Sequence, residues 1–295
     1  MEAFVWDIDP EIFRIGSFGP RYYGLMFALG FLVSYKMLEK VWAAENRSLE
    51  SLSSLLMHFM VGTILGARLG HCLFYDPVYF LSNPLEILKI WKGGLASHGG
   101  TIGVMVAVWI YAKKNLDQPY GWLADRLAIV IPFGSGCIRV GNFFNSEILG
   151  KPTDLPFAVI FKKHDMIPRH PAMLYEAFCY FAIFAFVGYR YKKHGKDLRP
   201  GSQIGIILMA IFTARFFLEF VKENQVRFED AMFLNMGQLL SIPFVIAGYL
   251  LYSGKYRRFM PSGYGFLEDG GALDNLIKKK DTKGQKPKKK KKKRK

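Results

Sequence analysis

Several apolar stretches, each close to the length of a bilayer-crossing helix, limit what this chain can fold into. A helix needs about 20 mostly apolar residues to cross the hydrocarbon core of a membrane. Hydrophobic residues make up 51% of the chain, and a soluble domain would have to bury several nearly continuous apolar runs at once. The sequence therefore predicts an all-α polytopic membrane protein with about seven transmembrane helices, over residues 22–43, 52–74, 95–112, 122–143, 173–191, 204–220 and 236–252.

Lysine and arginine gather in alternate loops between these stretches. They follow the third, fifth and seventh, at Lys113-Lys114, at residues 190–199 and from Lys255 onward. Short loops rich in Lys and Arg face the cytoplasm. We therefore expect the N-terminus outside and the C-terminus in the cytoplasm.

The net charge of +16 is concentrated at the C-terminus, where residues 278–295 hold 13 Lys or Arg and one Asp. Such a like-charge block is typical of a disordered, solvated tail. We expect an integral membrane domain over residues 1–255 and a basic cytoplasmic tail over 256–295, disordered from about residue 278. The tail fixes topology or contacts anionic lipid headgroups or RNA; no specific nucleic-acid partner is expected.

Two outer loops and one glycine repeat add detail to this architecture. Residues 76–94 contain a short amphipathic piece, which predicts an arm lying along the membrane interface. Residues 145–171 are long enough for a small outer head subdomain. Gly62, Gly66 and Gly70 recur every four residues and predict a close-packing face for a neighbouring helix.

The stretch Arg139–Glu147 ends the fourth apolar run with an arginine, two amides and a carboxylate. Charge in hydrocarbon is costly and usually faces a cavity or pathway. Arg139 and Asn142 share a helical face, and Asn145 continues it if the helix persists. Glu147 then falls near the helix end, where it can pair with an arginine. Gly141 lets another backbone approach, and Gly150 permits a turn after the site.

Other predicted helices also carry polar groups at their outer ends, so the predicted topology brings them to one level of one leaflet. These residues are Tyr23, Arg68, His71, His98, His170, Tyr175, Glu176, Arg215 and Glu219.

Structural interpretations compete with functional ones at each position. Arg139 and Glu147 could be a buried pair that only joins helices, and Arg215 and Glu219, four apart, could neutralise each other. His98 could be a satisfied structural histidine. However, Gly99 and Gly100 allow close access, and the positive helix start favours a neutral base and a nearby anion. His170 could be only a contact at the start of a helix. Tyr175 could belong to the aromatic belt at the membrane interface, and Glu176 could be a helix-cap residue.

Arginines in a lipid-facing cavity indicate an anionic substrate, because Arg is suited to bidentate phosphate contacts. A cavity at headgroup level indicates a phospholipid. The sequence has no Gly-x-Ser-x-Gly elbow and no zinc motif, and its three cysteines show no metal spacing. An enzyme of this kind would supply positioning, charge and one base, with the nucleophile coming from a second substrate. The alternatives are a transporter or scramblase of anionic phospholipids, or a purely structural membrane subunit.

These motifs resemble those of the prolipoprotein diacylglyceryl transferases of bacterial inner membranes, over roughly residues 15–252. The matching segments, in family order, are 21–24 (RYYG), 66–70 (GARLG), 97–100 (SHGG), 139–147 followed by Gly150, 170–176, 215–219 and 236–241. Two departures stand out: Ile211 occupies a position where the family usually has tyrosine, and residues 220–225 replace an Arg-x-Pro-Asp type sequence.

The resemblance implies transfer of diacylglyceryl from phosphatidylglycerol to the lipobox cysteine of a preprolipoprotein signal peptide, leaving a thioether and glycerol 1-phosphate. It also implies a seven-helix fold around a central cavity open to the outer leaflet of the bacterial inner membrane, and no metal or cofactor. We expect a monomer among membrane lipids, and the sequence leaves the oligomeric state open. The catalytic candidates are His98, Arg139, Arg215, Glu147 and Asn142. The phosphatidylglycerol-binding candidates are Arg139, Arg215, Arg68, Tyr23, Asn145, Gly150 and His170. The thiol base is left open among His98, Tyr23 and His170.

Overall fold

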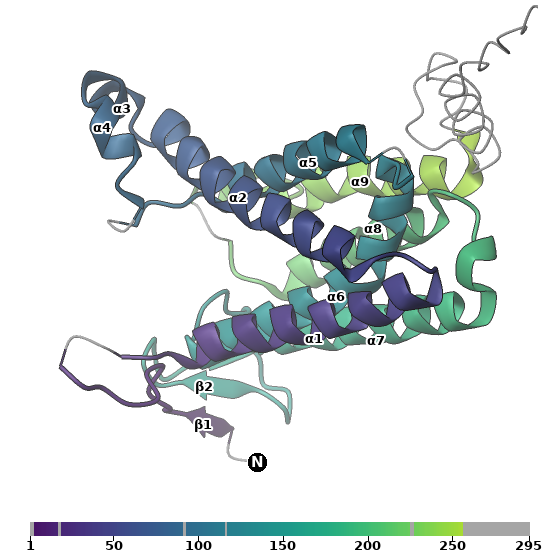
Figure 1. The fold of residues 1–295 in the computed structure, drawn as a ribbon. Coiled ribbons are helices and arrows are strands. Elements are labelled where there is room, and N and C mark those ends of the chain that lie inside the picture. The colour runs from purple at the N-terminus through teal and green to yellow at the C-terminus, as the bar shows by residue number, and fades with distance from the viewer. Residues whose placement is uncertain (1–2, 17–18, 91–92, 116, 225–226, 256–295) are drawn as a thin grey trace, which may run out of the picture. The chain divides into compact units, whose positions relative to one another are not determined.

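The structure is a computed structural model, mostly helical, and it describes residues 3–16, 19–90, 93–115, 117–224 and 227–255 (Figure 1). The long helices are α1 (Tyr22–Ala44), α2 (Leu49–Phe74), α5 (Ser97–Lys114), α6 (Tyr120–Phe144), α7 (Ala172–His194), α8 (Ser202–Leu218) and α9 (Met236–Ser253). The shorter elements are α3 (Pro77–Ser82), α4 (Pro84–Ile87), β1 (Phe4–Trp6), β2 (Val159–Phe161), β3 (Pro168–Arg169) and the 3₁₀ turns η2 (Gly195–Asp197), η3 (Glu219–Val221) and η4 (Arg227–Ala231). The tail predicted to be disordered lies outside the described residues.

Each predicted transmembrane stretch is a helix over nearly the predicted residues. The stretch predicted at 204–220, for example, is α8 followed directly by the turn η3. Within the described ranges, α2, α6, α7, α9 and α8 with η3 are long and apolar enough to cross a membrane, which makes five candidate spans. The chain is therefore a polytopic membrane protein. The other two predicted spans are helices as well, with 23 residues in α1 and 18 in α5.

Contacts divide the chain into two compact units, which are described separately. The first unit comprises Met1–Leu56 and Ala124–Ser262, and the described part of the second is Met57–Leu123. The first unit thus holds α1, α7, α8, α9, the strands and most of α6. The second holds most of α2, the short helices α3 and α4, and α5. The region predicted as one domain, residues 1–255, is therefore described as two units.

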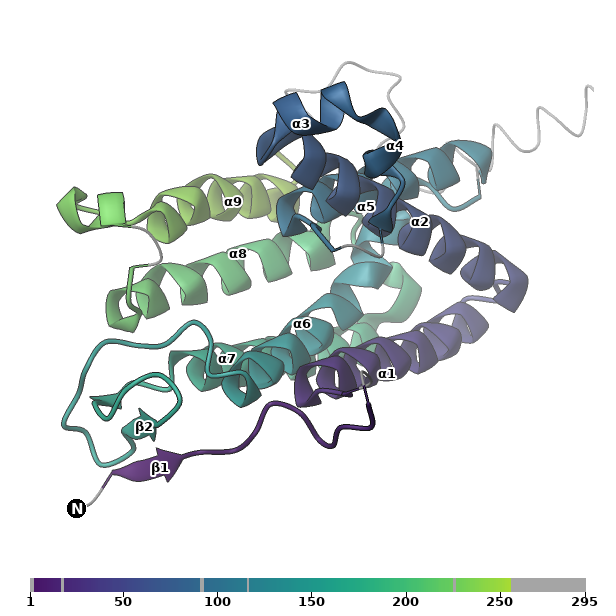
Figure 2. The ribbon, with the colours of Figure 1, turned by 90° about the vertical axis from the view of Figure 1, so that its left-hand side faces the viewer.

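In the first unit, α1, α6 and α7 lie side by side, and α8 pairs with α9 (Figures 1 and 2). Glycines allow the close approaches: a Cβ at Gly30 of α1 would lie 3.3 Å from Gly134 Cα of α6, and one at Gly248 of α9 would lie 2.7 Å from Gly205 O of α8. Buried polar contacts hold the helix ends. Arg126 of α6 makes a bidentate pair with Glu45, the residue after α1, at 3.0 and 2.9 Å.

The N-terminal residues complete a small three-stranded sheet in the order β1-β2-β3, with β1 parallel and β3 antiparallel to β2. The Trp6 ring lies 4.2 Å from the ring of Phe143 at the end of α6. The head predicted from residues 145–171 thus also contains β1, which the sequence interpretation had not assigned to it. The prediction of an all-α chain is corrected to this extent, because a three-residue strand offers no periodicity to detect.

In the second unit, the predicted glycine face of α2 packs on glycines of α5. A Cβ at Gly66 would lie 2.7 Å from Gly103 Cα, and one at Gly70 would lie 2.7 Å from Gly99 Cα. The predicted interfacial arm contains α3 and α4, each starting at a proline. Arg68 holds this arm by donating to the carbonyls of Glu86, Ile87, Gly93 and Gly94.

Candidate active site

The polar stretch at the end of α6 forms a chain of hydrogen bonds in the first unit. Arg139 Nη1 donates to Asn142 Oδ1 at 3.1 Å, as their shared helical face predicts. Asn142 Nδ2 donates to one oxygen of Glu147 at 2.9 Å, and Asn145 Nδ2 donates to the other at 3.1 Å. Two amides therefore fix the Glu147 carboxylate. The remaining amide oxygen, Asn145 Oδ1, is buried without a partner in the described part of the chain.

Three cations alternate with two carboxylates across α6, α7, α8 and the residues after η3. We call this set the charge network: Arg139, Glu176, Lys222, Glu219 and Arg215. Glu176, which is fully buried, lies 2.8 Å from Arg139 Nε and 3.2 Å from Lys222 Nζ. Glu219 lies 2.8 Å from Lys222 Nζ and 3.5 Å from Arg215 Nε. One continuous ionic path therefore joins Arg139 to Arg215, and the predicted Arg215–Glu219 pair is confirmed.

The expected pairing of Glu147 with an arginine is wrong. Arg139 pairs instead with Glu176 of α7, whose Oε2 lies 2.8 Å from Arg139 Nε. This contact is an ion pair and not a hydrogen bond, since Glu176 Oε2 accepts no hydrogen bond within the described residues. Glu147 follows α6 after Ser146, whose φ of 54° turns the chain away from the helix axis. That turn points the carboxylate at the two asparagine amides. The interpretation of Glu176 as a helix-cap residue is also wrong, since its side chain is the buried partner of two cations.

Arg139 and Arg215 differ in how much of their charge is engaged. The Arg139 side chain is 17% exposed and contacts Glu176 and Asn142, whereas that of Arg215 is 35% exposed. Nη1 and Nη2 of Arg215 make no hydrogen bond with the described residues. The buried Tyr180 hydroxyl of α7 interacts electrostatically with both arginines. The two guanidinium groups thus stand at the two ends of the charge network, with Arg215 the more exposed to a ligand.

Tyr23 of α1 lies beside this region because Gly141 leaves room for it. A Cβ at Gly141 would come within 2.9 Å of the Tyr23 ring and 3.3 Å of Tyr23 Cα. The predicted role of Gly141, close approach of another backbone, is thereby confirmed. The Tyr23 hydroxyl is within electrostatic range of Arg139 and Glu147.

Gly150 and His170 stand at the junction between the head and the charge network. Gly150 N donates to His170 O at 3.0 Å, and Gly150 forms an isolated bridge with Lys222. A Cβ there would lie 2.5 Å from His170 Cβ and 2.9 Å from Val221 O, so only glycine fits between these two segments. Gly150 is therefore not the turn residue that the sequence suggested; Ser146 and Ile148, with positive φ, form the turn.

The His170 ring contacts Tyr175, with Nδ1 and the hydroxyl oxygen 3.2 Å apart. Its burial lowers the pKa of His170 below the ordinary histidine value. A neutral imidazole accepts a hydrogen bond from the Tyr175 hydroxyl through an unprotonated Nδ1. Burial therefore favours the neutral form of His170, which lies on the head side of the charge network.

Two predicted site residues belong to the second unit, whose position relative to the charge network is not assigned. The guanidinium of Arg68 is buried among four backbone carbonyls and lies 5.1 Å from the Phe80 ring, which supports a structural role in the arm. His98 is exposed in the first turn of α5 and makes no hydrogen bond or ion pair with the described residues of its own unit. The glycine after it, Gly99, packs against Gly66 and Gly70 instead of leaving open access beside His98, so that expectation is corrected.

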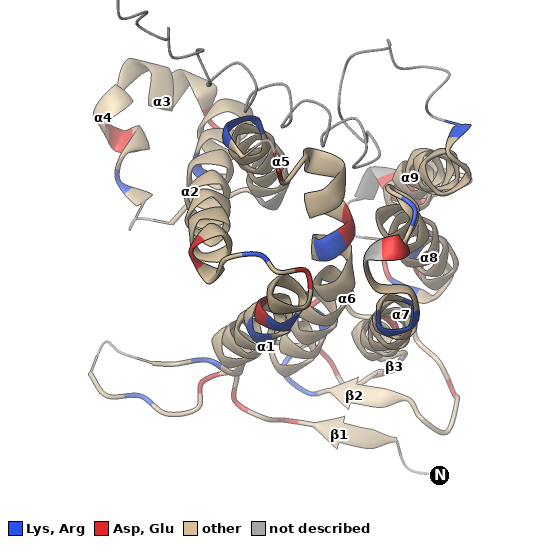
Figure 3. Cartoon of the chain, turned by 45° about the vertical axis from the view of Figure 1, so that its right-hand side comes forward, with Lys and Arg blue, Asp and Glu red and all other residues tan. Residues whose placement is uncertain are grey.

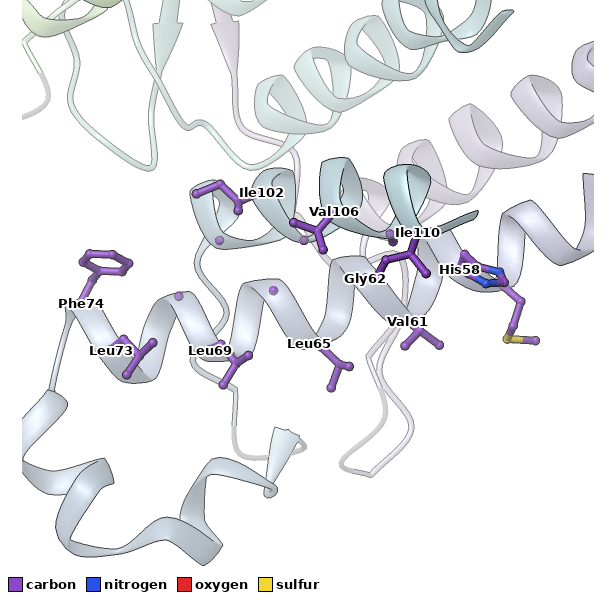
Figure 4. Close-up of a pocket in the computed structure, with 16 residues that line it drawn as sticks. His58, Val61, Gly62, Leu65, Leu69, Leu73, Phe74, Ile102, Val106 and Ile110 are labelled. Carbon is purple, nitrogen blue, oxygen red and sulfur yellow. The ribbon is translucent and has the colours of Figure 1, made fainter. Parts of the chain in front are cut away.

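An apolar groove of about 560 Å³ runs along α2 and α5 in the second unit (Figure 4). Leu65, Leu69 and Leu73 line it from α2, and Ile102 and Val106 line it from α5. His58 is the one ionisable residue in its lining. The described residues that line the groove include no Lys or Arg to bind an anionic headgroup, so the groove is not the candidate active site.

The chemistry available in the first unit is binding and stabilisation of an anion. Arginine and lysine supply fixed positive charge, and asparagine and tyrosine supply neutral hydrogen-bonding groups. No set of three His, Cys, Asp or Glu residues within the described ranges could hold a metal ion. The expectation that no cofactor takes part stays a prediction.

Sequence reasoning missed Lys222 and assigned Glu176 a lesser role. Lys222 is buried and lies between the carboxylates of Glu176 and Glu219. Its spacing of three from Glu219 was a signal that one turn of helix would bring them together. Asn235, which donates to Glu219 Oε2 at 3.2 Å and caps α9, carried no such signal because it lies 16 residues away along the chain.

Comparison with known proteins gives one consistent result. A family model described as prolipoprotein diacylglyceryl transferase matches residues 10–253. The chain is 45% identical over 246 residues to the phosphatidylglycerol–prolipoprotein diacylglyceryl transferase of Chloroherpeton thalassium, covering 83% of this chain and 92% of that protein. Proteins with the same description in Tolumonas auensis and Vibrio cholerae are 44% and 38% identical, covering 83% and 85% of this chain and 95% and 93% of theirs.

Proposed function

The chain belongs to the prolipoprotein diacylglyceryl transferase family, and from that premise we propose how its charge network serves the reaction. Its activity is transfer of the diacylglyceryl group from phosphatidylglycerol to a prolipoprotein. The acceptor is the thiol of the lipobox cysteine, and the products are a thioether and glycerol 1-phosphate. In chemical terms, a sulfur–carbon bond forms at the glyceryl carbon while the bond from that carbon to the phosphate oxygen breaks.

Arg139 and Arg215 bind the phosphate of phosphatidylglycerol and stabilise it as it leaves. The observation that carries this proposal is the continuous ionic path from Arg139 through Glu176, Lys222 and Glu219 to Arg215. Carboxylates hold each arginine through Nε, and Arg139 Nη1 also donates to Asn142, so Arg139 offers the substrate its Nη2 and Arg215 offers both terminal nitrogens. Preorganised cations of this kind stabilise a developing phosphate charge because they need no reorganisation during the reaction.

Asn142, Asn145 and Glu147 orient the headgroup. The unpartnered Oδ1 of Asn145 suits a hydroxyl of the glycerol headgroup, which donates a hydrogen bond. Tyr23 supplies a neutral hydroxyl beside Arg139. Gly150 and His170 set the position of the segment after η3 that carries Lys222, so their influence on phosphatidylglycerol binding passes through the charge network.

His98 is the proposed acceptor of the thiol proton, because the thiolate is the nucleophilic form of cysteine. The proton moves from sulfur to an imidazole nitrogen as the sulfur attacks the glyceryl carbon. Its exposure at the start of α5 leaves the ring accessible to a substrate. Tyr23 and His170 are the alternative acceptors.

The proposed arrangement in the bacterial inner membrane has seven spans around a central cavity open to the outer leaflet. The head and charge network face outward, and the C-terminus lies in the cytoplasm. The distribution of Lys and Arg among the loops supports this orientation. We propose a monomer among membrane lipids, with no specific nucleic-acid partner.

A reconstituted assay tests the activity. Purified protein in liposomes containing phosphatidylglycerol is incubated with a lipobox peptide, and the mass of the peptide is measured by mass spectrometry. The expected result is an added diacylglyceryl mass, absent when serine replaces the peptide cysteine and when phosphatidylcholine replaces phosphatidylglycerol. An unmodified cysteine peptide, with correctly folded protein, would contradict the proposal.

A further inference from the structure

A second cavity lies at the other end of α7, α8 and α9 from the charge network, still within the first unit. It has a volume of about 450 Å³ and is lined by Arg190, Arg199, Ser202, Tyr249, Tyr252 and Ser253. We call it the end cavity. At about 1.5 Å per residue, Glu176 and Arg190 are separated by roughly 20 Å along α7. Because these helices are candidate membrane spans, the end cavity and the charge network belong to opposite faces of the membrane.

Two arginines of the end cavity have no acidic partner among the described residues. Arg190 Nε donates to the neutral Gln203 Oε1 at 3.1 Å, which holds its side chain in place. Arg199 lies over the Tyr252 ring, with the guanidinium carbon 5.7 Å from the ring centre. Neither guanidinium forms an ion pair with a carboxylate in the described part of the chain. Their uncompensated positive charge therefore favours an anionic ligand.

Ser202 supplies a second and independent sign of a ligand. The residue is 3% exposed, and its Oγ is buried with no partner among the described residues. The backbone N–H groups around it are already used, because Gly201, Gln203 and Ile204 donate to the buried carboxylate of Asp125. A buried hydroxyl without a partner costs free energy. A phosphate oxygen in the end cavity would accept its hydrogen bond.

The rim of the end cavity matches the headgroup level of a membrane. Tyr249 and Tyr252 are partly exposed, and Lys255 Nζ lies 3.1 Å from the Tyr249 hydroxyl, to which it donates. Tyrosines at helix ends are typical of the membrane–water interface. The last turn of α7 adds Lys192 and Lys193, and Figure 3 shows basic residues at this end of the helix. A ligand here would meet cations, hydroxyls and aromatic rings together.

We propose that the end cavity binds the phosphate of an anionic phospholipid headgroup in the leaflet opposite the charge network. Arg190 and Arg199 pair with the phosphate, and Ser202 donates to one of its oxygens. Bound there, the lipid ties the ends of α7, α8 and α9 to the membrane surface. The site is separate from transferase chemistry and does not depend on it.

Lipid binding to purified full-length protein in detergent tests this proposal by native mass spectrometry. The probe is phosphatidylserine, which is anionic but is not the diacylglyceryl donor. The double variant Arg190→Gln/Arg199→Gln is compared with Lys192→Gln/Lys193→Gln, which removes equal charge from the exposed end of α7. We expect the affinity for one bound lipid to fall about tenfold in the arginine variant and to stay unchanged in the lysine variant.

Ser202→Ala keeps the charge and provides a milder variant in case the double arginine variant fails to fold. Its affinity for phosphatidylserine should fall several-fold, with phosphatidylcholine binding unaffected. Equal phosphatidylserine binding by the arginine and lysine variants would overturn the proposal, as would arginine-dependent binding of phosphatidylcholine. Arginine-dependent stabilisation by millimolar inorganic phosphate, without lipid binding, would assign the cavity to free phosphate and overturn the lipid assignment.

Discussion

Lys222 is the residue on which the two buried carboxylates of the charge network depend. It lies between Glu176 and Glu219, and all three side chains are buried. Removing one partner of a buried ion pair leaves an uncompensated charge, which costs roughly 3–5 kcal/mol. We therefore expect Lys222→Met to lower the unfolding temperature in detergent and to abolish transfer. Lys222→Arg, which keeps the charge, should restore both; failure of Lys222→Met to alter either would contradict this role.

His170 gives the head an acid-sensitive contact. Burial lowers its pKa in the folded protein relative to the unfolded value of about 6.5. As pH falls through about 6.5, the unfolded chain binds a proton first, so stability decreases until pH passes below the folded value. Between pH 7.5 and pH 5.5, the unfolding temperature should fall further for wild type than for His170→Asn. Equal losses would mean that His170 does not contribute this dependence.

Helix α2 depends on glycine at its contact with α5 in the second unit. A side chain at Gly66 would bring Cβ to 2.7 Å from Gly103 Cα, a contact that only separation of the helices relieves. Overpacking of this kind costs roughly 1–3 kcal/mol. We expect Gly66→Val to lower the unfolding temperature in detergent.

Gly188 of α7 is the matched control, because a Cβ there would meet nothing within 4 Å. Gly188→Ala should leave stability unchanged or raise it by up to about 1 kcal/mol, since alanine favours helix over glycine. If Gly66→Val unfolded at the wild-type temperature, the close α2–α5 contact would not exist as described.

The sequence predicted the helices well because their signal is local. Apolar length sets each span, and spacings of three or four residues predicted the Arg139–Asn142 and Arg215–Glu219 contacts. The choice of Glu176 over Glu147 as the partner of Arg139 could not be predicted in this way. It depends on the turn at Ser146 and on how α7 packs beside α6, both of which are tertiary features. The pairing of β1 with β2 could not be predicted either, because it joins two segments of the first unit that are far apart along the chain.

At the scale of the whole molecule, the first unit separates two kinds of polar site along its helices. The charge network occupies one end of α7, α8 and α9, and the end cavity occupies the other. Between them, α8 presents mostly apolar side chains, with a mean hydropathy of 2.1 over its candidate span. Such a division favours chemistry on one membrane face with lipid anchorage on the other, rather than a polar path through the bilayer.

The central claim is that Arg139 has two roles. Its charge pairs with Glu176, and its forked guanidinium also binds the phosphate of the substrate. Arg139→Lys separates the two roles, because lysine keeps the ion pair but loses the bidentate phosphate contact. The control is Arg126→Lys on the same helix, where arginine also pairs with a buried carboxylate, Glu45.

The decisive measurement is the rate of diacylglyceryl transfer to a lipobox peptide by both variants, reconstituted with phosphatidylglycerol and matched for folded protein. Arg139→Lys should transfer at least about 100-fold more slowly than wild type, as expected for loss of a preorganised charge contact. Arg126→Lys should stay within about threefold of wild type, since roughly 20 Å of helix separates it from Arg139. A near-wild-type rate for Arg139→Lys would contradict the account.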